Sequence, residues 1–474
     1  MQGVYPVADV RTAEAAAMAL VPEGALMQRA ATALATQCLD VLGAGYGANV
    51  VLLVGGGNNG GDALFAGARL ARRGARVTAL LVDPARAHAG GLAALRRAGG
   101  RAAAADPDLV AGADLVVDGV LGIGGRGGLR GPAAALAQAA MDRPTVAVDV
   151  PSGVDADSGV ASGAAVRADV TVTFGCLKPG LVTGTGAALA GEVRLVDIGL
   201  GPHLPSAPTE VLEAVDVLAA LSTPGAHDDK YTRGVVGVIA GSPEYSGAGL
   251  LATGAALHAG AGMVRYLGRS PGLIRSHYPE VVVHEESRPH EVRVQAWVVG
   301  PGLGTDDAAM ALLADVLRTD VPVIVDADAI TLVARAPGMV HGRHAPTVLT
   351  PHDREFARLA GEPGPDRLAA ARRAAADLGV TVLLKSMTTV VAAPDGAAFV
   401  NPTGTPWLAT AGSGDVLSGL IGSLLATGLD PAHAAAVGAY VHGVAGQQAA
   451  AGGPPAAGDI LAAVRGAILA IETR

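Results

Sequence analysis

The chain has 474 residues, half of them apolar, a formal net charge of −9 and only two cysteines. This length favours two domains of roughly 200–250 residues. The cysteines are too few for a disulfide framework. The acidic net charge, without a basic tract, excludes nucleic-acid binding through phosphate neutralisation. No apolar run reaches the roughly 20 residues of a membrane span and the N-terminus has no secretion signal, so we expect a cytoplasmic protein that acts on small molecules and binds neither nucleic acid nor membrane.

The first half of the chain alternates between strand-like and helical segments. A helical pattern covers 7–42, and apolar runs then alternate with helices rich in Ala, Leu and Arg; the runs are 50–54, 76–81, 114–118, 145–150, 170–174 and 192–198. Alternation of this kind predicts an α/β domain with a Rossmann-like, doubly wound parallel sheet. Several runs end beside glycine or aspartate, at the edge where open α/β sheets bind ligands.

A segment rich in Gly and Pro, 199–208, interrupts this pattern and is followed by a short helix to about residue 220 and a polar loop. The alternation then restarts, with apolar runs at 235–240, 263–267, 296–299, 321–326, 347–349 and 380–384. The two halves do not repeat each other's motifs. We therefore expect a fusion of two α/β domains, residues 1–212 and 220–474, with the junction near 205–225.

The loop Gly-Gly-Gly-Asn-Asn-Gly-Gly-Asp, at 55–62, leaves a buried strand and enters a helix. Such a turn can present backbone N–H groups to an anion, although a tight turn that only packs on its helix is the alternative. Asn58 and Asn59 add amide groups, and Asp62 adds a carboxylate that would repel a purely anionic ligand. A sugar hydroxyl, an amide or a bound cation fits this loop better.

Two further aspartates end strands of the same predicted sheet. Asp118 opens the glycine-rich loop 119–131, and Asp149 opens the loop 151–159. A single aspartate in such a position is often a helix cap. Carboxylate, hydroxyl and carbonyl oxygens are also the ligands that hard cations prefer. Asn59, Asp118 and Ser152 could therefore share one monovalent cation.

Four motifs of the first half together resemble the YjeF N-terminal family, the NAD(P)H-hydrate epimerases: 58–62, the loop after Asp118, VDVPSGVDADSG at 148–159 and FGCLKPG at 174–180. These enzymes interconvert the R and S forms of hydrated NAD(P)H. The resemblance implies potassium on Asn59, Asp118 and Ser152, with Asp149 acting at the carbon that bears the hydroxyl, where a carboxylate can move a proton.

The same resemblance implies a set of residues that bind the hydrate: Asn58, Asn59, Gly60, Gly61, Asp62, Gly122, Ile123, Gly124, Gly125, Arg126, Gly127, Gly128 and Asp149. The chain departs from the family at Ala63, where glycine is usual and a methyl group could crowd the turn.

The second Gly/Asp loop, Thr-Ala-Gly-Ser-Gly-Asp at 410–415, precedes an apolar helix at 416–426. A helix N-terminus places N–H groups and a positive dipole end around an anion, and Asp415 could accept a proton from an attacking hydroxyl. Taken alone, Asp415 could also be a helix cap. The segment 385–389 supplies a lysine and hydroxyls suited to phosphates, which favours a phosphoryl site.

The order of motifs in the second half resembles the ribokinase-like superfamily and, within it, the ADP/ATP-dependent NAD(P)H-hydrate dehydratases, over about 225–470. The motifs lie at 230–234, 240–248, 300–304, 326–328, 350–352, 355–356 and 410–415. The resemblance implies a ribokinase-like α/β domain that phosphorylates the hydrate hydroxyl, with Asp415 as base, and then expels phosphate, a better leaving group than hydroxide. ADP or ATP would be the co-substrate, with magnesium on the nucleotide.

By this second resemblance, the residues that contact the hydrate are Ala248, Gly304, His352 and Asp415, and those that contact the adenine nucleotide are Lys385, Ser386, Met387, Thr388, Thr389 and Gly414. Without the resemblance, His352 reads as a surface loop histidine. The chain departs from the family at Asp353-Arg354, where Pro-Gly is usual, and at Ser386 and Ala411, where glycine is usual.

The sequence predicts a bifunctional metabolite-repair enzyme, with two alternatives. One is a ribokinase-like small-molecule kinase with a nucleotide-binding, non-catalytic N-terminal domain, which would retain a phosphorylated product. The other is an N-terminal domain that only recognises a ligand, against which the three aspartates Asp62, Asp118 and Asp149 argue. Surfaces rich in Gly and Ala favour a homo-oligomer. The sequence leaves open the choice between ADP and ATP, and between hydrated NADH and NADPH.

Overall fold

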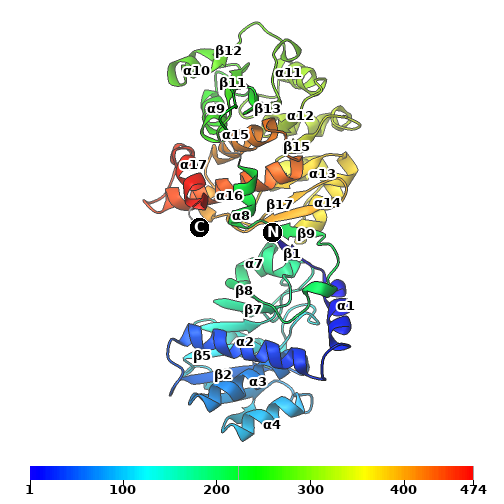
Figure 1. Cartoon of the computed structure of the whole chain (residues 1–474), viewed down its shortest axis with the longest axis vertical. Helices are drawn as coiled ribbons and strands as arrows, with labels where there is room; N and C mark the ends of the chain where they lie inside the picture. Colours follow the sequence, from blue (N-terminus) through cyan, green and yellow to red (C-terminus); the bar gives the residue numbers. More distant parts are fainter. Residues whose placement is uncertain (222–223, 473–474) are drawn as a thin grey trace. The chain divides into compact units, whose positions relative to one another are not determined.

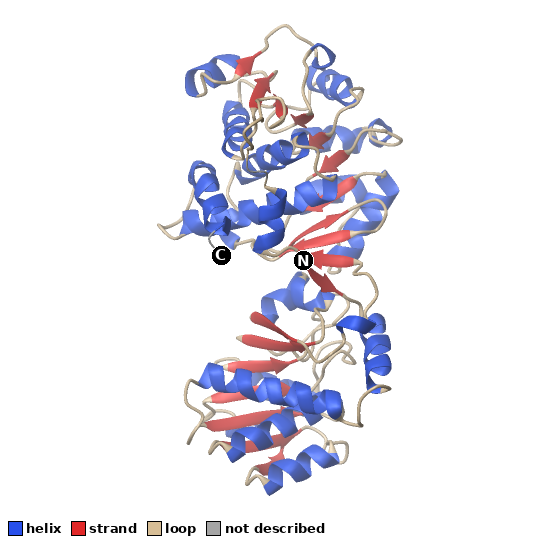
Figure 2. Cartoon of the chain, viewed as in Figure 1, coloured by secondary structure: helices blue, strands red, loops and turns tan. Residues whose placement is uncertain are grey.

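The structure, a computed structural model, describes residues 1–221 and 224–472. The chain forms two compact units, essentially Gln2–Pro208 and Thr209–Arg474, and both are α/β units in which helices flank a sheet of mainly parallel strands (Figures 1 and 2). None of the helices within the described residues is long and apolar enough to cross a membrane.

The sheet of the first unit has the strand order β4-β3-β2-β5-β6-β7-β8, and every neighbouring pair is parallel. Its strands are β2 (Asn49–Val54), β3 (Arg76–Leu81), β4 (Arg101–Ala104), β5 (Leu115–Gly119), β6 (Thr145–Val148), β7 (Val170–Phe174) and β8 (Glu192–Val196). This is the order of a Rossmann-like doubly wound sheet, so the predicted fold class is confirmed for this half.

Two differences from the predicted strands have local causes. The run 145–150 ends as a strand at Val148 because Asp149 has φ of +67°, a left-handed conformation that cannot continue a strand. Strand β4 was not predicted, because its Arg-Ala-Ala-Ala sequence lacks the β-branched and aromatic residues that mark strands.

Helices cover both faces of this sheet. They are α1 (Val7–Met18), α2 (Ala25–Leu42), α3 (Asn58–Arg72), α4 (Ala89–Arg97), α5 (Gly131–Ala140), α6 (Pro179–Val182) and α7 (Gly184–Ala190); strand β1 (Gln2–Val4) precedes them. Alternate residues of β2 enter two separate cores, Val50, Leu52 and Val54 on one face and Val51 and Leu53 on the other. A strand buried on both faces explains the continuous apolar run in the sequence.

The sheet of the second unit runs β9-β18-β17-β16-β15-β14-β13-β10-β11-β12. Its strands are β9 (Thr209–Val211), β10 (Val235–Ile239), β11 (Met263–Tyr266), β12 (Val282–Val283), β13 (Ala296–Val299), β14 (Val323–Val325), β15 (Thr347–Leu349), β16 (Thr381–Leu384), β17 (Thr389–Ala392) and β18 (Ala398–Asn401). Every neighbouring pair from β16 through β15, β14, β13, β10 and β11 to β12 is parallel, whereas β17 is antiparallel to both β16 and β18.

Strand β9 pairs with β18, so residues 209–212, which we expected at the end of the first domain, belong to the second sheet. The helices of this unit are α8 (Ala214–Ala220), α9 (Ser246–His258), α10 (Pro271–His277), α11 (Asp307–Leu317), α12 (Asp328–Arg335), α13 (Asp353–Ala360), α14 (Arg367–Leu378), α15 (Ser413–Ala426), α16 (Pro431–Ala450) and α17 (Ala457–Glu472).

Helix α15 is held close to its neighbours by small residues. A Cβ at Gly419 would lie 2.2 Å from the carbonyl oxygen of Ala252 in α9, so only glycine permits this approach. The helix also packs against α16 and β13. The N-terminus of α15, which carries the second Gly/Asp loop, is therefore fixed relative to the carboxyl ends of the strands.

Candidate active sites

The first site lies where β2 and β5, the neighbours at the switch in strand order, end side by side. Residues 58–62 form the first turns of α3, directly after β2. Asn59 reaches the loop after β5, because a Cβ at Gly122 would lie only 2.9 Å from Asn59 Oδ1. Asn59 Nδ2 and Asp62 Oδ1 are buried and have no hydrogen-bond partner among the described residues. A ligand that offers polar groups would satisfy both atoms.

Asp118 ends β5 and is fully buried. Its carboxylate accepts hydrogen bonds from Ser152 Oγ (2.7 Å), Ser152 N (2.8 Å) and Val120 N (3.2 Å). Burial raises the pKa of Asp118 to about 6, and no cationic side chain of the described residues pairs with it. A buried carboxylate without a counter-charge is costly, so a proton or a bound cation would be favourable here.

Asp149 is the most constrained residue of the first site. Its Oδ1 accepts hydrogen bonds from Lys178 Nζ (2.7 Å) and Thr173 Oγ1 (3.3 Å). The Lys178 side chain is 1% exposed and follows β7 in the chain. The sequence interpretation missed Lys178, although the motif at 174–180 contains it.

Two more carboxyl groups surround Asp149. Burial, and then the charges of Asp149 and Glu14, raise the pKa of Asp62 well above its ordinary value. Burial and Asp149 likewise raise the pKa of Glu14, against the opposing charges of Lys178 and Arg11. Glu14 comes from α1, a helix that no sequence motif had linked to the site. The site therefore contains the ion pair of Asp149 and Lys178 beside two carboxyl groups, Asp62 and Glu14, whose pKa values are raised.

The glycine-rich loop 122–128 is partly open to solvent. Gly124, Arg126 and Gly127 are exposed, whereas Ile123 and Gly125 are half-buried. Gly128 lies against Ser162 and Gly163, since a Cβ there would be 2.8 Å from each. Of this predicted set, the structure brings Gly122 to Asn59 and leaves the tip of the loop free to meet a ligand.

The departure at Ala63 has a structural explanation. Ala63 is fully buried, and its methyl group faces the end of β5, where a Cβ at Gly119 would lie 2.6 Å from Ala63 Cβ. Glycine at position 119 thus makes room for the methyl group, and the turn of α3 is not crowded.

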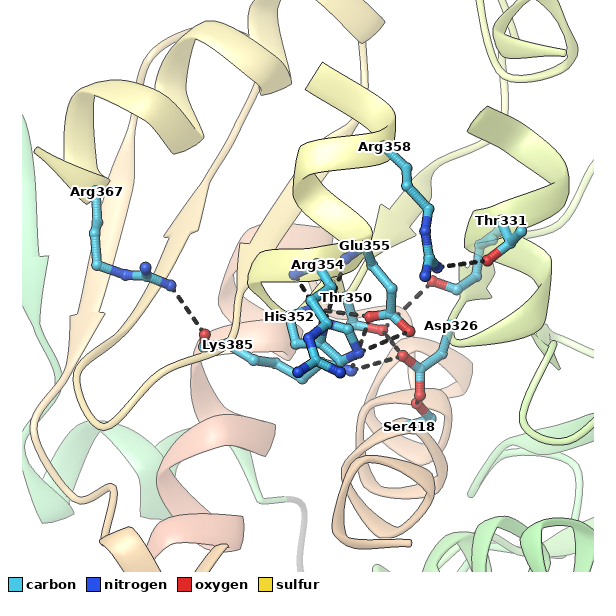
Figure 3. A network of polar contacts seen from close by, with 11 residues as sticks. Asp326, Thr331, Thr350, His352, Arg354, Glu355, Arg358, Arg367, Lys385 and Ser418 are labelled. Carbon is cyan, nitrogen blue, oxygen red and sulfur yellow. Dashed lines mark hydrogen bonds and ion pairs between the residues drawn. The ribbon is translucent and has the colours of Figure 1, made fainter. Parts of the chain in front are cut away.

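The second site is a network of polar side chains at the ends of β14, β15 and β16 (Figure 3). Lys385 Nζ lies 2.9 Å from Asp326 Oδ1 and 3.7 Å from Glu355 Oε2. Asp326 is buried and also accepts hydrogen bonds from Thr350 Oγ1 (2.8 Å) and Ser418 Oγ (2.7 Å). Burial alone would raise the pKa of Asp326, but Lys385 and the two hydroxyls hold it below its ordinary value.

Asp415 lies in the first turn of α15, beside this network. Burial, and then the charge of Asp326, raise the pKa of Asp415 to about 7, although Lys385 opposes the shift. No donor among the described residues is bonded to its carboxylate. A carboxylate that titrates near neutral pH and is not committed to a hydrogen bond has the properties of a general base.

Lys385 lies beside the N-terminus of α15, an arrangement that suits an anion. A Cβ at Gly414 would lie 3.3 Å from Lys385 Nζ and 3.7 Å from Asp326 Oδ2, so the ammonium group lies next to the first turn of the helix. The adjacent Ser413 Oγ is 3.1 Å from Nε2 of His442, a buried side chain of α16. Burial lowers the pKa of His442 to about 4, so its ring is neutral near pH 7. His442 was not predicted.

The turn 386–389 engages most of its own hydroxyl groups. Ser386 Oγ donates to Thr388 O at 2.7 Å, and Thr389 Oγ1 donates to Ser386 O at 2.9 Å. Met387 is exposed, and Gly404 packs on its carbonyl group. The structure brings this turn to Lys385 and the loop 402–405, but the Ser386 and Thr389 hydroxyls stabilise the turn itself.

The remaining predicted residues lie at neighbouring strand ends. His352 caps α13: its Nδ1 accepts hydrogen bonds from Arg354 N (3.1 Å) and Glu355 N (3.3 Å), while half of its side chain stays exposed. Gly304 N donates to Asp328 Oδ2 at 2.8 Å. Ala248, in α9, lies against Gly302, where a Cβ would be 2.8 Å from Ala248 Cβ.

The departure at Asp353-Arg354 creates an ion pair. Arg367 Nη2 donates to Asp353 Oδ1 at 2.6 Å and to the carbonyl oxygen of Lys385 at 3.0 Å. This arginine therefore links the start of α13, next to His352, to the turn that carries Lys385.

Comparison with known proteins places these features in one class. A family model described as NAD(P)H-hydrate dehydratase matches residues 236–471, and one described as YjeF-related protein N-terminus matches residues 23–180. A ribokinase-like superfamily protein from Enterococcus faecalis superposes on 56% of this chain and 98% of its own, with a TM-score of 0.51 and 28% identity. The second unit thus has the ribokinase-like fold that the sequence predicted.

Two further matches identify the family. The ADP/ATP-dependent NAD(P)H-hydrate dehydratase from Bacillus subtilis, co-crystallised with ATP and Mg²⁺, superposes on 55% of this chain and 98% of its own, with a TM-score of 0.50 and 29% identity. The bifunctional NAD(P)H-hydrate repair enzyme Nnr of Mycobacterium leprae is 50% identical over 97% of this chain and 96% of its own length. The chain belongs to the family of bifunctional NAD(P)H-hydrate repair enzymes.

Proposed function

We propose that the chain repairs hydrated NAD(P)H in two steps, each on one unit. The first unit interconverts the R and S hydrates, and the second converts the S hydrate to NAD(P)H at the expense of ADP or ATP. The observation that carries this proposal is that each unit presents a carboxylate in a different environment. Asp149 is bonded to a buried lysine, whereas Asp415 has a pKa raised to about 7 and lies beside Lys385 and the N-terminus of α15.

In the first unit, Asp149 would move a proton to and from the hydroxyl oxygen on the carbon that is epimerised, so that the hydroxyl group leaves as water and water adds back to either face of that carbon. That carbon is next to the ring nitrogen, whose lone pair can assist the departure of the hydroxyl group. Residues 58–62 and 122–128 would bind the hydrate, and the unpartnered Asn59 Nδ2 and Asp62 Oδ1 offer polar contacts to it. Glu14 adds a further carboxyl group near Asp149.

Potassium fits the oxygen atoms around Asp118. Ser152 Oγ lies 2.7 Å from the Asp118 carboxylate and 3.1 Å from the carbonyl oxygen of Leu121, and Asn59 lies next to the same loop. The mixed hydroxyl, amide and carboxylate oxygen donors at this site suit a hard monovalent cation. When bound by Asn59, Asp118 and Ser152, potassium would neutralise the buried carboxylate.

In the second unit, Asp415 would take the proton from the hydrate hydroxyl as that oxygen attacks the terminal phosphoryl group of the nucleotide. Lys385 and the backbone N–H groups of the first turn of α15 would stabilise the charge on the transferred phosphoryl group. Loss of phosphate from the ring, followed by loss of a proton from the adjacent ring carbon, then restores the dihydropyridine. Ala248, Gly304 and His352 would contact the hydrate, and residues 385–389 and Gly414 the nucleotide.

Magnesium fits the charge balance of this site. The carboxylates of Asp326, Asp328 and Glu355 all act on Asp415, with Lys385 as the opposing cation. Such an acidic surplus would repel nucleotide phosphates that carry no counter-ion. Magnesium that is bound to the phosphates supplies the missing positive charge, as is general in phosphoryl transfer.

The decisive experiment supplies a mixture of R and S hydrates of NADH with ADP or ATP and follows recovery of the dihydronicotinamide absorbance. Asp415→Asn should reduce nucleotide-dependent recovery by about 10²–10⁴-fold and leave epimerisation unchanged. Asp149→Asn should leave the R hydrate unconsumed once spontaneous epimerisation is subtracted. Full dehydration by Asp415→Asn, or full use of the mixture by Asp149→Asn, would contradict the respective assignment.

The same assay separates repair from the kinase alternative, because repair releases inorganic phosphate and NADH whereas a kinase retains a phosphorylated product. That alternative is not favoured, since the relative that matches nearly the whole chain is a repair enzyme. We also propose a homo-oligomer formed through surfaces rich in Gly and Ala, which light scattering tests, and a cytoplasmic location, which cell fractionation tests.

A further inference from the structure

Lysine is rare in this chain. The 34 basic residues comprise 31 arginines and only three lysines, at positions 178, 230 and 385. Two of these three form ion pairs with an aspartate that follows a parallel strand, Lys178 with Asp149 and Lys385 with Asp326. Since arginine supplies almost every other cation, the lysines at these two positions indicate a requirement that arginine does not meet.

The surroundings of Lys178 show what that requirement is. Its ammonium group donates to Asp149 Oδ1 (2.7 Å), Thr173 Oγ1 (2.9 Å) and Phe174 O (2.9 Å). An ammonium group has three N–H donors on one atom, whereas a guanidinium group spreads five over a flat fork. The three acceptors converge on a single point in the interior, which suits the compact ammonium group.

Because all three donors are committed, Lys178 has none left for a ligand. Its side chain is also 1% exposed, so a substrate cannot reach it. Lys178 can therefore act on the reaction only through Asp149.

The effect on Asp149 is both geometric and electrostatic. Lys178 and Thr173 both bond Oδ1, while Oδ2 has no hydrogen-bond partner among the described residues and remains for the substrate. Asp149 is also held in a left-handed conformation, with φ of +67°, which surrounding contacts must stabilise.

The other titratable groups near this pair are mostly acidic. Asp62 of α3 and Glu14 of α1 both interact with Asp149, and each carries or can carry a negative charge. Arg11 of α1 acts on Glu14, and Cys176, from the β7–α6 connection, has its own pKa raised, mainly by burial. An ammonium group in direct contact opposes the like-charge repulsion.

We propose that Lys178 is a positioning residue of the epimerase site: it pairs with the Asp149 carboxylate, fixes one carboxylate oxygen and leaves the other to the substrate. This inference rests on the proposed role of Asp149 in epimerisation.

The test uses the full chain with Lys178→Met, which keeps the length of the side chain and removes its charge, and Lys178→Arg, which keeps the charge. Lys178→Met should lower kcat for epimerisation by about 10²-fold and move the acid limb of the pH–rate profile upward by about one unit or more. KM for the hydrate should change little, because Lys178 does not touch the substrate. Lys178→Arg should retain the wild-type position of the acid limb with a kcat reduced about tenfold, since the charge stays but the geometry is lost.

Lys230→Met is the matched control, because Lys230 is exposed and in the other unit, and it should leave the epimerase profile unchanged. Thr173→Val is the second variant, used if Lys178→Met does not fold. It removes an acceptor of Lys178 and the weaker donor to Asp149, so it should lower kcat by severalfold and leave KM unchanged. If Lys178→Met folds, an unshifted acid limb or an effect confined to KM would overturn the inference. If it does not fold, an unaltered kcat in Thr173→Val would overturn it. Full activity of Asp149→Asn would instead overturn the proposed function of Asp149, whatever the lysine variants do.

Discussion

Each unit pairs a lysine with an aspartate at the end of a parallel strand, but the two pairs are buried in opposite ways. In the first unit the Lys178 side chain is 1% exposed and that of Asp149 is 13% exposed. In the second unit the Asp326 side chain is 1% exposed and that of Lys385 is 20% exposed. The accessible member of each pair is the one that can meet a ligand, so the same ion pair presents a carboxylate in one site and an ammonium group in the other.

This difference matches the chemistry that we propose for each site. Epimerisation needs a carboxylate that moves a proton, and Lys178 supports it from the interior. Phosphoryl transfer needs a cation beside the phosphate, and Asp326, saturated by Thr350, Ser418 and Lys385, supports that cation from the interior. The base of the second site, Asp415, is then a separate residue on α15.

The largest effect is expected when Lys385, the accessible lysine of the second site, is neutralised. Lys385→Met should reduce kcat/KM for ADP or ATP in dehydration by about 10³-fold, because it removes a charge-assisted donor to the transferred phosphoryl group. Steady-state kinetics of NADH recovery from the S hydrate measure this, and epimerisation in the same protein is the internal control. If dehydration is retained, Lys385 does not serve the phosphate.

A second test concerns the pH dependence of dehydration. Asp415 must be ionised to act as a base and its pKa is raised to about 7, so kcat should rise with pH through about 7 and then level off. Asp326 contributes to that raised pKa, so Asp326→Asn should move the midpoint to lower pH. The same substitution leaves Lys385 without its main partner and should lower kcat roughly tenfold. A pH profile that is flat from pH 5 to 9 would exclude Asp415 as the base.

The features that could be predicted from the sequence are those set by residues close together in the chain. The two α/β units, the strands β2, β3, β7 and β13 and the Gly/Asp loops follow local patterns, because strands buried on both faces are continuous apolar runs. Strands β4, β12, β17 and β18 were not predicted, since they are short or carry few distinguishing residues.

The supporting residues of the sites have no local signal of the same kind. Lys178 meets Asp149 across 29 residues of chain, and His442 meets Ser413 across the same separation. Glu14 acts on Asp62 only because the fold brings α1 near the start of α3. Such contacts follow from tertiary packing, although the scarcity of lysine was visible in the sequence and could have singled out Lys178. The roles of the predicted site residues remain predictions.

A third and smaller expected effect is the dependence of the first unit's stability on potassium, which the second site does not share. The pKa of Asp118 is raised from 3.8 to about 6 in the folded protein, so between these values the folded chain holds a proton that the unfolded chain has released. Stability without potassium should therefore fall as pH rises from about 4 to about 6. Potassium should offset this loss only where Asp118 is ionised.

Thermal melting of the epimerase unit within the full chain measures this effect. At pH 7.5, potassium should raise Tm by a few degrees relative to tetramethylammonium, and at pH 5 the difference should shrink. Asp118→Asn should remove the pH-dependent part. Equal melting in both salts at pH 7.5 would contradict a potassium site at Asp118.

The smallest expected effect concerns the support of the N-terminus of α15 by His442. Because the pKa of His442 is lowered to about 4, its ring stays neutral through the working range, and its contact with Ser413 is a hydrogen bond between neutral groups. Such a bond is worth about 1 kcal/mol, so Ser413→Ala should raise KM for the nucleotide by roughly fivefold with little change in kcat. His442→Gln, which can still bond the hydroxyl group, should change KM less than His442→Leu does. If the increase in KM in these variants grew as pH fell from 8 to 6, His442 would titrate in this range and act as a charge. The second site would then depend on a buried cation, as the first depends on Lys178.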